Sequence, residues 1–187
     1  MTMKKATITN RTSQNENLGF FDLIATRHSI RAYKSQKLTD ETINKILSAA
    51  NKAPSAGNLQ SYHVFAAIQS EDKKQLAIAA HDQDFIKDAS IVLIFCADYS
   101  AEKKYGERGR ELYCIQDATI ACAYAQLACH ALGLASVWVG AFEEDQVRKF
   151  LSLENGLKPV AMLVIGFADE EPEKTDRKPI YEIHQKA

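Results

Sequence analysis

The chain has 187 residues, of which 46% are hydrophobic and 25% are charged, a balance that fits one globular domain and excludes an intrinsically disordered chain. Lysine and arginine number 23 and aspartate and glutamate 24, so the net charge is -1. That charge provides no general attraction for nucleic acid, and we expect no nucleic-acid partner. Any anion site must therefore be local.

The N-terminal residues 1–19 are polar and show no periodic pattern, which predicts a flexible arm before one domain over residues 20–187. The arm has no apolar signal-peptide core, and apolar runs such as ASIVLIFCA are far too short for a membrane span. We therefore expect a cytoplasmic protein with no membrane partner. Four cysteines without a CxxC pair are expected to be reduced and packed: Cys96, Cys114, Cys122 and Cys129.

The first half of the chain predicts three helices and two strands. FFDLIATRHS reads as a short helix ending near Arg27, and LTDETINKILSAANKAPS as a helix that Thr39 or Asp40 caps and Pro54 stops. SYHVFAAI and ASIVLIFCA read as strands with a helix between them. The second strand is apolar on both faces, which places it inside a sheet.

The dominant element of the second half is RELYCIQDATIACAYAQLACHALGL, a helix that is apolar almost all round and ends at Gly133. It must be covered on every side, by its own sheet or by a partner subunit. ASVWVGAF and KPVAMLVIGFA predict strands on either side of a short helix, EEDQVRKFLSL, and the tail from residue 171 reads as irregular. This order of elements predicts a mixed sheet with helices packed against it.

Common catalytic and nucleotide-binding motifs are absent. No GxGxxG follows a strand, and neither GxxxxGK[ST] nor GxSxG occurs. The five histidines show no ligand-like spacing, so we expect no metal site. Nothing in the sequence supplies a nucleophile with its base, and we predict no catalytic side chain.

Two basic clusters and one loop are candidates for binding. TRHSIRAYK gathers cations and a hydroxyl that suit a phosphate: Arg27, His28, Ser29 and Arg31. Arg177 and Lys178 form a second pair near the C-terminus. Each cluster alone is better interpreted as solvated surface, but together they predict two sides of one anion site. The loop NKAPSAGNLQ is small and permissive, which suggests backbone held close to a flat or anionic ligand.

Four stretches in series, RHSIRAY, APSAGNLQ, YGERGRELYCIQDATIACAYAQLACHALGLASVWVGAF and DRKP, resemble the FMN-dependent nitroreductase family over residues 20–184. The resemblance implies an α+β fold with a nitroreductase-like mixed β-sheet flanked by helices, an α-β-α sandwich. It also implies a homodimer formed through the long central helices, with two FMN molecules at the subunit interface.

The resemblance implies a role for each matching position. The FMN phosphate would be bound from both ends of the chain, by Arg27, His28, Ser29, Arg177 and Lys178. Arg31 would face the pyrimidine edge of the flavin, where a cation favours the reduced form. A loop from the partner subunit would supply ring contacts and an amide: Pro54, Ser55, Ala56 and Asn58.

The segment that passes the reactive edge of the ring would be Trp138, Val139 and Gly140. A core position for Trp138 is an equal alternative. Gln116 and Asp117 match a QD pair whose role is either in the site or in helix packing. Ser61 and Tyr62 depart from the Pro-aromatic pair common in the family at this point, where the strand enters beside the flavin.

The implied activity is that of an FMN-dependent NAD(P)H oxidoreductase reducing nitroaromatics, quinones or similar acceptors. Ping-pong hydride transfer would pass through flavin N5, so the chemistry is carried by FMN. Alternatives are a flavin storage or sensor protein without turnover, a specialised dehalogenase or flavin-cleaving member, and a structural or partner-binding domain. A Lys/Arg-rich segment over residues 103–110 either attracts an anionic substrate or nicotinamide phosphate, or is solvated surface.

Overall fold

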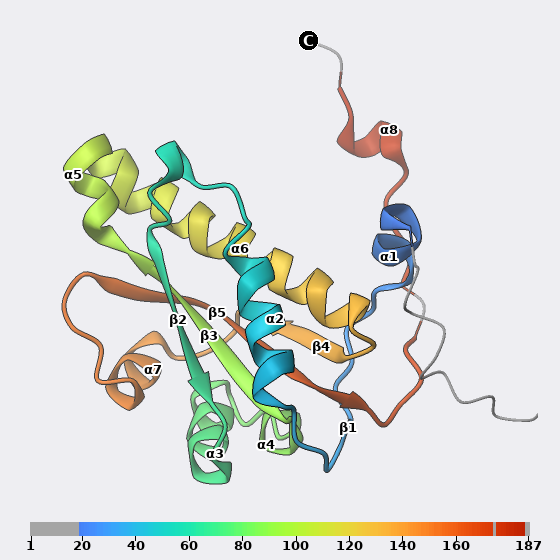
Figure 1. The fold of residues 1–187 in the computed structure, drawn as a ribbon. Coiled ribbons are helices and arrows are strands. Elements are labelled where there is room, and N and C mark those ends of the chain that lie inside the picture. Colours follow the sequence, from blue (N-terminus) through green and yellow to red (C-terminus); the bar gives the residue numbers. More distant parts are fainter. Residues whose placement is uncertain (1–18, 174, 186–187) are drawn as a thin grey trace, which may run out of the picture.

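Helices cover both faces of one sheet in the computed structural model, which describes residues 19–173 and 175–185. In chain order the elements are α1 (Phe20–Thr26), β1 (Tyr33–Lys34), α2 (Asp40–Ala50), β2 (Tyr62–Ala67), α3 (Ser70–Ala79), α4 (Phe85–Asp88), β3 (Ile91–Asp98), α5 (Glu102–Tyr105), α6 (Cys114–Ala131), β4 (Ala135–Val139), α7 (Glu144–Phe150), β5 (Leu157–Ala168) and α8 (Ile180–Ile183) (Figure 1). The predicted arm, residues 1–19, lies outside the described residues except for Gly19.

The sheet has the strand order β1-β5-β3-β2, and β4 also pairs with β5. Each of these pairs is antiparallel, and a parallel component exists as one isolated bridge between Ser29 and Ser136. β3 lies between β5 and β2 and its residues are buried from Ile91 to Ala97. The prediction that this strand is interior is therefore confirmed.

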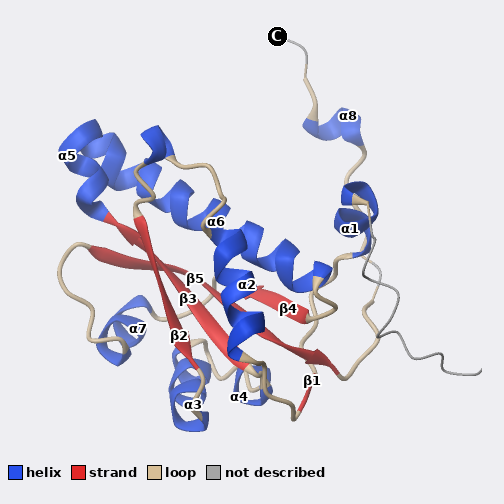
Figure 2. Ribbon diagram, in the orientation of Figure 1, coloured by secondary structure: helices blue, strands red, loops and turns tan. Residues whose placement is uncertain are grey.

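Two hydrophobic cores lie on opposite faces of the sheet (Figure 2). Because neighbouring residues of a strand point to opposite faces, Leu93 and Phe95 pack with α2 and α6, whereas Val92 and Ile94 pack with α3, α4 and α7. The predicted sandwich of helices, sheet and helices is therefore confirmed.

The ends of the two longest helices follow from local chemistry. Thr39 caps α2, since its Oγ1 accepts a hydrogen bond from the Thr42 amide at 3.2 Å. α2 ends at Ala50, so a turn over residues 51–53 stops it before Pro54 can. α6 ends as predicted: Gly133 has a φ of 73°, and the amide of Leu134 donates to the carbonyl of Cys129 at 2.9 Å.

The covering of α6 is incomplete within one chain. Seven of its residues are buried against the protein, but Tyr124 on its outer side is 40% exposed and Leu132 at its end is 41% exposed. α1 and α8 lie near this end of α6 and rise from the rest of the molecule (Figure 1). α8 also corrects the prediction that the whole tail is irregular.

The four cysteines are free and buried, as predicted. Burial raises the pKa of Cys96 and of Cys129 to about 12, so both thiols stay protonated at neutral pH. Within the described residues, the structure has no helix that is both long and apolar enough to cross a membrane.

Candidate cofactor-binding site

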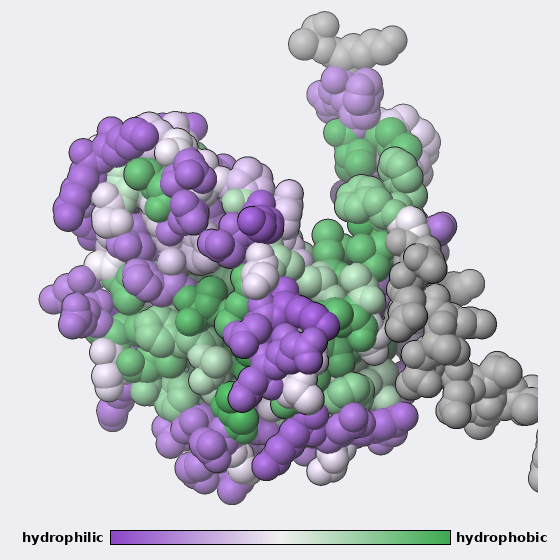
Figure 3. Space-filling view, in the orientation of Figure 1, coloured by the Kyte–Doolittle hydropathy of each residue, from purple (hydrophilic) through white to green (hydrophobic). Residues whose placement is uncertain are grey.

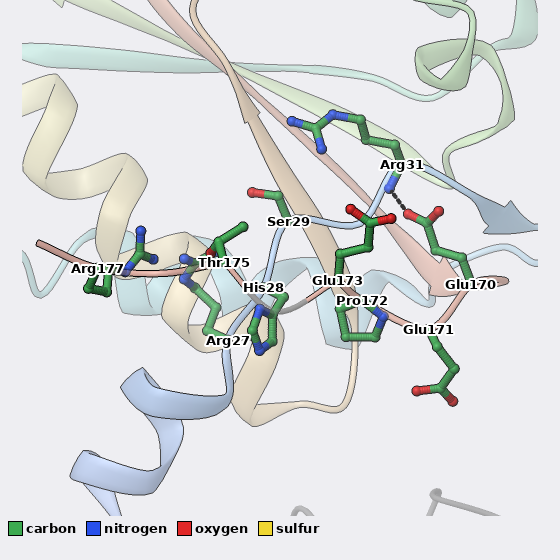
Figure 4. A pocket seen from close by; sticks show the side chains of 10 residues that line it. All are labelled: Arg27, His28, Ser29, Arg31, Glu170, Glu171, Pro172, Glu173, Thr175 and Arg177. Atoms are coloured by element: carbon green, nitrogen blue, oxygen red, sulfur yellow. Dashed lines mark hydrogen bonds between the residues drawn. The ribbon is translucent and has the colours of Figure 1, made fainter.

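A cavity of about 520 Å³ lies where the segment after α1 meets the segment after β5 (Figure 4). Its walls are formed by Arg27, His28, Ser29, Arg31, Glu170, Glu171, Pro172, Glu173, Thr175 and Arg177. Two clusters 150 positions apart in the sequence therefore line one cavity. Lys178, which the sequence grouped with Arg177, is exposed and is not among the lining residues.

Backbone contacts hold the first wall in place. The amide of Ile30 donates to the carbonyl of Ser136 in β4 at 3.2 Å, and the Ile30 side chain is buried. The Glu170 carboxylate accepts hydrogen bonds from the amides of Arg31 and Ala32, at 2.5 and 3.2 Å. Because the main chain provides the anchoring, the side chains of this segment are left to line the cavity.

Tyr33 fixes the end of the same segment. Its ring is buried, and its hydroxyl donates to the carbonyl of Ile30 at 2.7 Å. The ring lies so close to Gly166 of β5 that a Cβ there would stand 2.7 Å from Tyr33 Cδ1. β1 is only two residues long, so a glycine that admits the tyrosine ring is part of what holds the cavity wall to the sheet.

The cations of the cavity are divided between its two ends. The side chains of Arg27 and Arg177 lie next to each other, and Arg31 lies at the opposite end, with Ser29 between (Figure 4). Burial lowers the pKa of Arg27, and the positive charge of Arg177 lowers it further. Two adjacent guanidiniums that repel each other favour a bound anion, and their planar donors suit a phosphate.

His130, near the end of α6, contacts the same region. Thr26 donates its hydroxyl to the carbonyl of Asp22 at 2.7 Å, so at 2.9 Å it accepts from Nε2 of His130. Burial lowers the pKa of His130, and the charges of Arg27 and His28 lower it further. His130 is thus a packed side chain at the boundary of a positively charged region.

The loop at the other end of α6 is fixed by a buried carboxylate. Asp117 is 2% exposed, and its oxygens accept from the amides of Ala56 at 2.9 Å and Ser61 at 3.2 Å. Gly57 and Asn58 both have positive φ angles, 54° and 58°, a conformation that suits small or amide residues. Asp117 therefore sets the path of the loop that carries Pro54, Ser55, Ala56 and Asn58.

This role for Asp117 was one of two that the sequence left open. A carboxylate inside a helix rich in alanine and cysteine is itself a signal, because a buried charge requires partners. The sequence alone gives no indication that those partners are two main-chain amides 56 and 61 positions away.

One chain does not bring the loop and the cavity together. The loop contacts Asp117 and the α1 end contacts His130, and the 13 helical positions from Asp117 to His130 correspond to about 20 Å. Two groups of predicted site residues are thus separate in a single chain, one at each end of α6.

The third group of predicted site residues, Trp138 to Gly140, lies on a segment that begins beside the cavity and leads away from it. Ser136 of β4 bridges Ser29, and Trp138 and Gly140 follow two and four residues later, about 7 to 14 Å along the strand. Trp138 is half-buried in the core with α2 and α6, and Val139 is buried on the opposite face. Val139 can therefore offer a ligand only its main chain, and Gly140 is exposed.

Comparison with known proteins agrees with this architecture. The family model described as the nitroreductase family matches residues 24–83 and 67–167. A protein of Methanothermobacter thermautotrophicus, provisionally named NADH dehydrogenase/NAD(P)H nitroreductase, is 33% identical over 160 residues, which cover 83% of this chain and 80% of the relative.

Solved structures are similar in both fold and size. A nitroreductase family protein of Clostridium difficile 630 superposes with a TM-score of 0.79 and 31% identity, covering 90% of this chain and 98% of that one. An FMN-dependent nitroreductase of Clostridium difficile R20291 superposes with a TM-score of 0.72 and 27% identity, covering 82% of this chain and 90% of that one. From the family match and these similarities, the chain belongs to the nitroreductase family.

Proposed function

We propose that this protein is an FMN-dependent NAD(P)H oxidoreductase that reduces nitroaromatics, quinones or similar acceptors. The observation that carries the proposal is the pairing of Arg27 with Arg177 in one cavity, beside the hydroxyl of Ser29. A doubly charged phosphate monoester matches two guanidiniums and a hydroxyl in charge and in donor geometry. An FMN-dependent relative and an NAD(P)H-linked one support the choice of cofactor and electron donor.

In this proposal the chain's residues bind and orient the cofactor. Arg27, Ser29 and Arg177 hold the phosphate, with His28 beside them and the exposed Lys178 next to Arg177 in the sequence, and Arg31 provides a cation at the pyrimidine edge. The main chain at Trp138, Val139 and Gly140 borders the ring. Bound FMN supplies the redox chemistry, a hydride exchange at N5 in which NAD(P)H and then an acceptor use one position in turn. The chain itself needs no general acid or base for that exchange.

The active form in this proposal is a homodimer. Pro54, Ser55, Ala56 and Asn58 of one copy complete the cavity of the other, which accounts for two site halves about 20 Å apart along α6. The described surface also suits an obligate partner: α1 and α8 expose Phe20, Phe21, Ile180, Tyr181 and Ile183 by 62% to 80%. Figure 3 shows hydrophobic residues along the column formed by these two helices. Such patches mark interfaces.

Flavin titration tests the proposal directly. We expect FMN to bind with quenching of its fluorescence, and Arg27→Gln and Arg177→Gln each to weaken binding roughly 10- to 100-fold, since each removes a charge-assisted hydrogen bond. Riboflavin, which lacks the phosphate, should bind weakly to all three proteins and be unaffected by the substitutions. Lys149→Gln, on α7 and away from the cavity, is the control for net charge.

Turnover is tested with the flavin-loaded protein. NAD(P)H oxidation should require a nitroaromatic or quinone, and double-reciprocal plots at several acceptor concentrations should be parallel, as a ping-pong cycle requires. A protein that binds FMN but oxidises neither nicotinamide with any acceptor would instead be a flavin store or sensor. A protein that takes up no FMN contradicts the proposal as a whole.

A further inference from the structure

Residues 99–113, between β3 and α6, form a cluster of tyrosines and cations. Tyr105 and Tyr113 meet edge to face, with ring centroids 5.2 Å apart. The Lys104 ammonium lies 5.3 Å from the centroid of Tyr105, and the Arg108 guanidinium lies 5.4 Å from that of Tyr113. Both distances are within the range of cation–π attraction. We call these four residues the Tyr-cation cluster.

The cations of this segment differ in how they are neutralised. Arg110 lies over Tyr99 but also forms ion pairs with Glu102 and Glu111, at 3.5 and 3.3 Å. In the described part of the chain, no carboxylate forms an ion pair with Lys104 or Arg108. The Nε of Arg108 donates to the hydroxyl of Tyr113 at 2.9 Å, which orients the guanidinium while its two terminal nitrogens remain available as donors. Positive charge is therefore held in place at the tyrosine rings.

The Tyr-cation cluster rests on the loop that follows α2. A Cβ built on Gly57 would stand 2.2 Å from the hydroxyl oxygen of Tyr105 and 2.7 Å from Nζ of Lys104. The absence of a Cβ at Gly57, whose positive φ also favours glycine, permits so close an approach. Asp117 holds the same loop from the helix side. The loop at Gly57 therefore lies next to the Lys104 ammonium, and Arg108 joins the same cluster through the contact of Tyr113 with Tyr105.

We propose that Lys104 and Arg108, positioned on Tyr105 and Tyr113, make this enzyme select planar aromatic substrates that carry a negative charge. The inference rests on the proposed function, in which this loop borders the flavin ring and hence the place where substrates bind. The tyrosine rings provide flat apolar surface, and the cations provide attraction for a carboxylate, sulfonate or phosphate at the substrate's edge. Partly exposed cations at a site of this kind raise the capture rate of anions.

Two substrates of the same enzyme can carry that charge. One is an acceptor such as a nitrobenzoate, and the other is the nicotinamide donor with a 2′-phosphate, NADPH rather than NADH. The test therefore has two arms: the ratio of kcat/KM for 4-nitrobenzoate to that for neutral 4-nitrobenzyl alcohol, and the ratio for NADPH to NADH. Each arm compares two molecules that differ chiefly in charge.

The double variant combines Lys104→Gln with Arg108→Gln. A second variant, Arg108→Lys alone, keeps the charge. Lys149→Gln on α7 removes one charge from the other side of the sheet and serves as the control. We expect the double variant to lower at least one ratio roughly tenfold, with the neutral member of the pair changed less than about twofold. Arg108→Lys and Lys149→Gln should keep the wild-type ratios.

The outcomes separate this inference from the proposed function on which it rests. A fall in the acceptor ratio identifies the acceptor as the charged substrate, and a fall in the donor ratio identifies NADPH. Flavin-loaded variants with both ratios unchanged, or with charged and neutral substrates impaired equally, would overturn this inference alone. A wild-type protein that retains no FMN would overturn the proposed function and this inference with it.

Discussion

The two ends of α6 use charged side chains in opposite ways. Near its C-terminal end, Arg27 and Arg177 line a cavity where their like charges repel each other. Near its N-terminal end, Asp117 is 2% exposed and both its oxygens accept hydrogen bonds from the main chain. The first region holds two like charges beside each other, and the second hydrogen-bonds its carboxylate to the main chain.

Under the proposed function, this difference separates residues that bind a ligand from residues that stabilise the fold. Like charges held side by side destabilise the free protein and favour binding of a counter-ion. Charge that is buried and fully hydrogen-bonded fixes a conformation. Both regions matched the same family pattern, and only their surroundings distinguish their tasks.

The largest effect is expected from disrupting the proposed homodimer, because the cavity of one copy and the loop of the other can then no longer meet. Phe21→Asp with Tyr181→Asp places charge on side chains of α1 and α8 that are 80% and 78% exposed. Since burying those charges at an interface is costly, we expect a monomer by light scattering and nearly complete loss of retained flavin, read as visible absorbance. Ile78→Asp, at a 59% exposed position of α3, should remain a flavin-bound dimer. A yellow dimer from the double variant would contradict the shared site.

The second prediction concerns the loop end alone. Asp117→Asn keeps the size of the side chain but replaces one acceptor oxygen with a donor, so one of two amides, Ala56 or Ser61, loses its partner. We expect the free energy of unfolding in urea to fall by about 1 to 3 kcal/mol. Thr119→Ala, on the exposed side of the same helix, should stay within about 0.5 kcal/mol of the parent. Equal stability of the two variants would show that Asp117 does not anchor the loop.

The smallest effect concerns the cavity end and depends on pH. Burial lowers the pKa of His130, and the charges of Arg27 and His28 lower it further. The folded protein therefore keeps this imidazole neutral, whereas the unfolded chain takes up a proton near pH 6.5. Stability should therefore decrease as the pH falls below about 6.5, by less than about 1 kcal/mol since the imidazole is only partly buried. Urea midpoints at neutral and mildly acidic pH measure the loss.

His130→Gln provides the comparison for that measurement, because it keeps a side chain that donates a hydrogen bond and cannot titrate. The parent should lose more stability on acidification than the variant does. Added FMN should diminish the parent's loss, since a phosphate beside Arg27 offsets the repulsion that lowers the pKa. Identical pH dependence of the two proteins would exclude His130 as the titrating group.

Much of the fold could be predicted because local signals decide it. The apolar run of β3, the Thr39 cap of α2 and Gly133 after α6 each specify an element through neighbouring residues. β1 could not be predicted, since two residues give no period and Tyr33 is held by Gly166, 133 positions away. α5 and α8 are four residues each, too short for a periodic pattern.

The site was predicted unevenly for a related reason. That Arg27 and Arg177 line one cavity follows from two basic motifs, each visible in the sequence. The anchoring role of Asp117 depends on its carboxylate meeting main-chain amides that are distant in the sequence. Main-chain amides carry no sequence signature, so this role could not be predicted. The place of Lys178 outside the cavity likewise depends on which way the chain turns beside Arg177, and two adjacent cations look alike in a sequence.

The hydrogen bonds by which Asp117 anchors its loop have a consequence for evolution and for engineering. The anchoring acts on the peptide groups of Ala56 and Ser61. Within the loop, the Ser55 Oγ also accepts a hydrogen bond from the Gln60 amide at 3.0 Å, and Asn58 has a positive φ of 58°, so both residues contribute to the curve of the backbone. Mutational libraries at Pro54 should therefore yield folded protein at high frequency. Evolution could change the substrate preference through this loop without altering the fold that carries it.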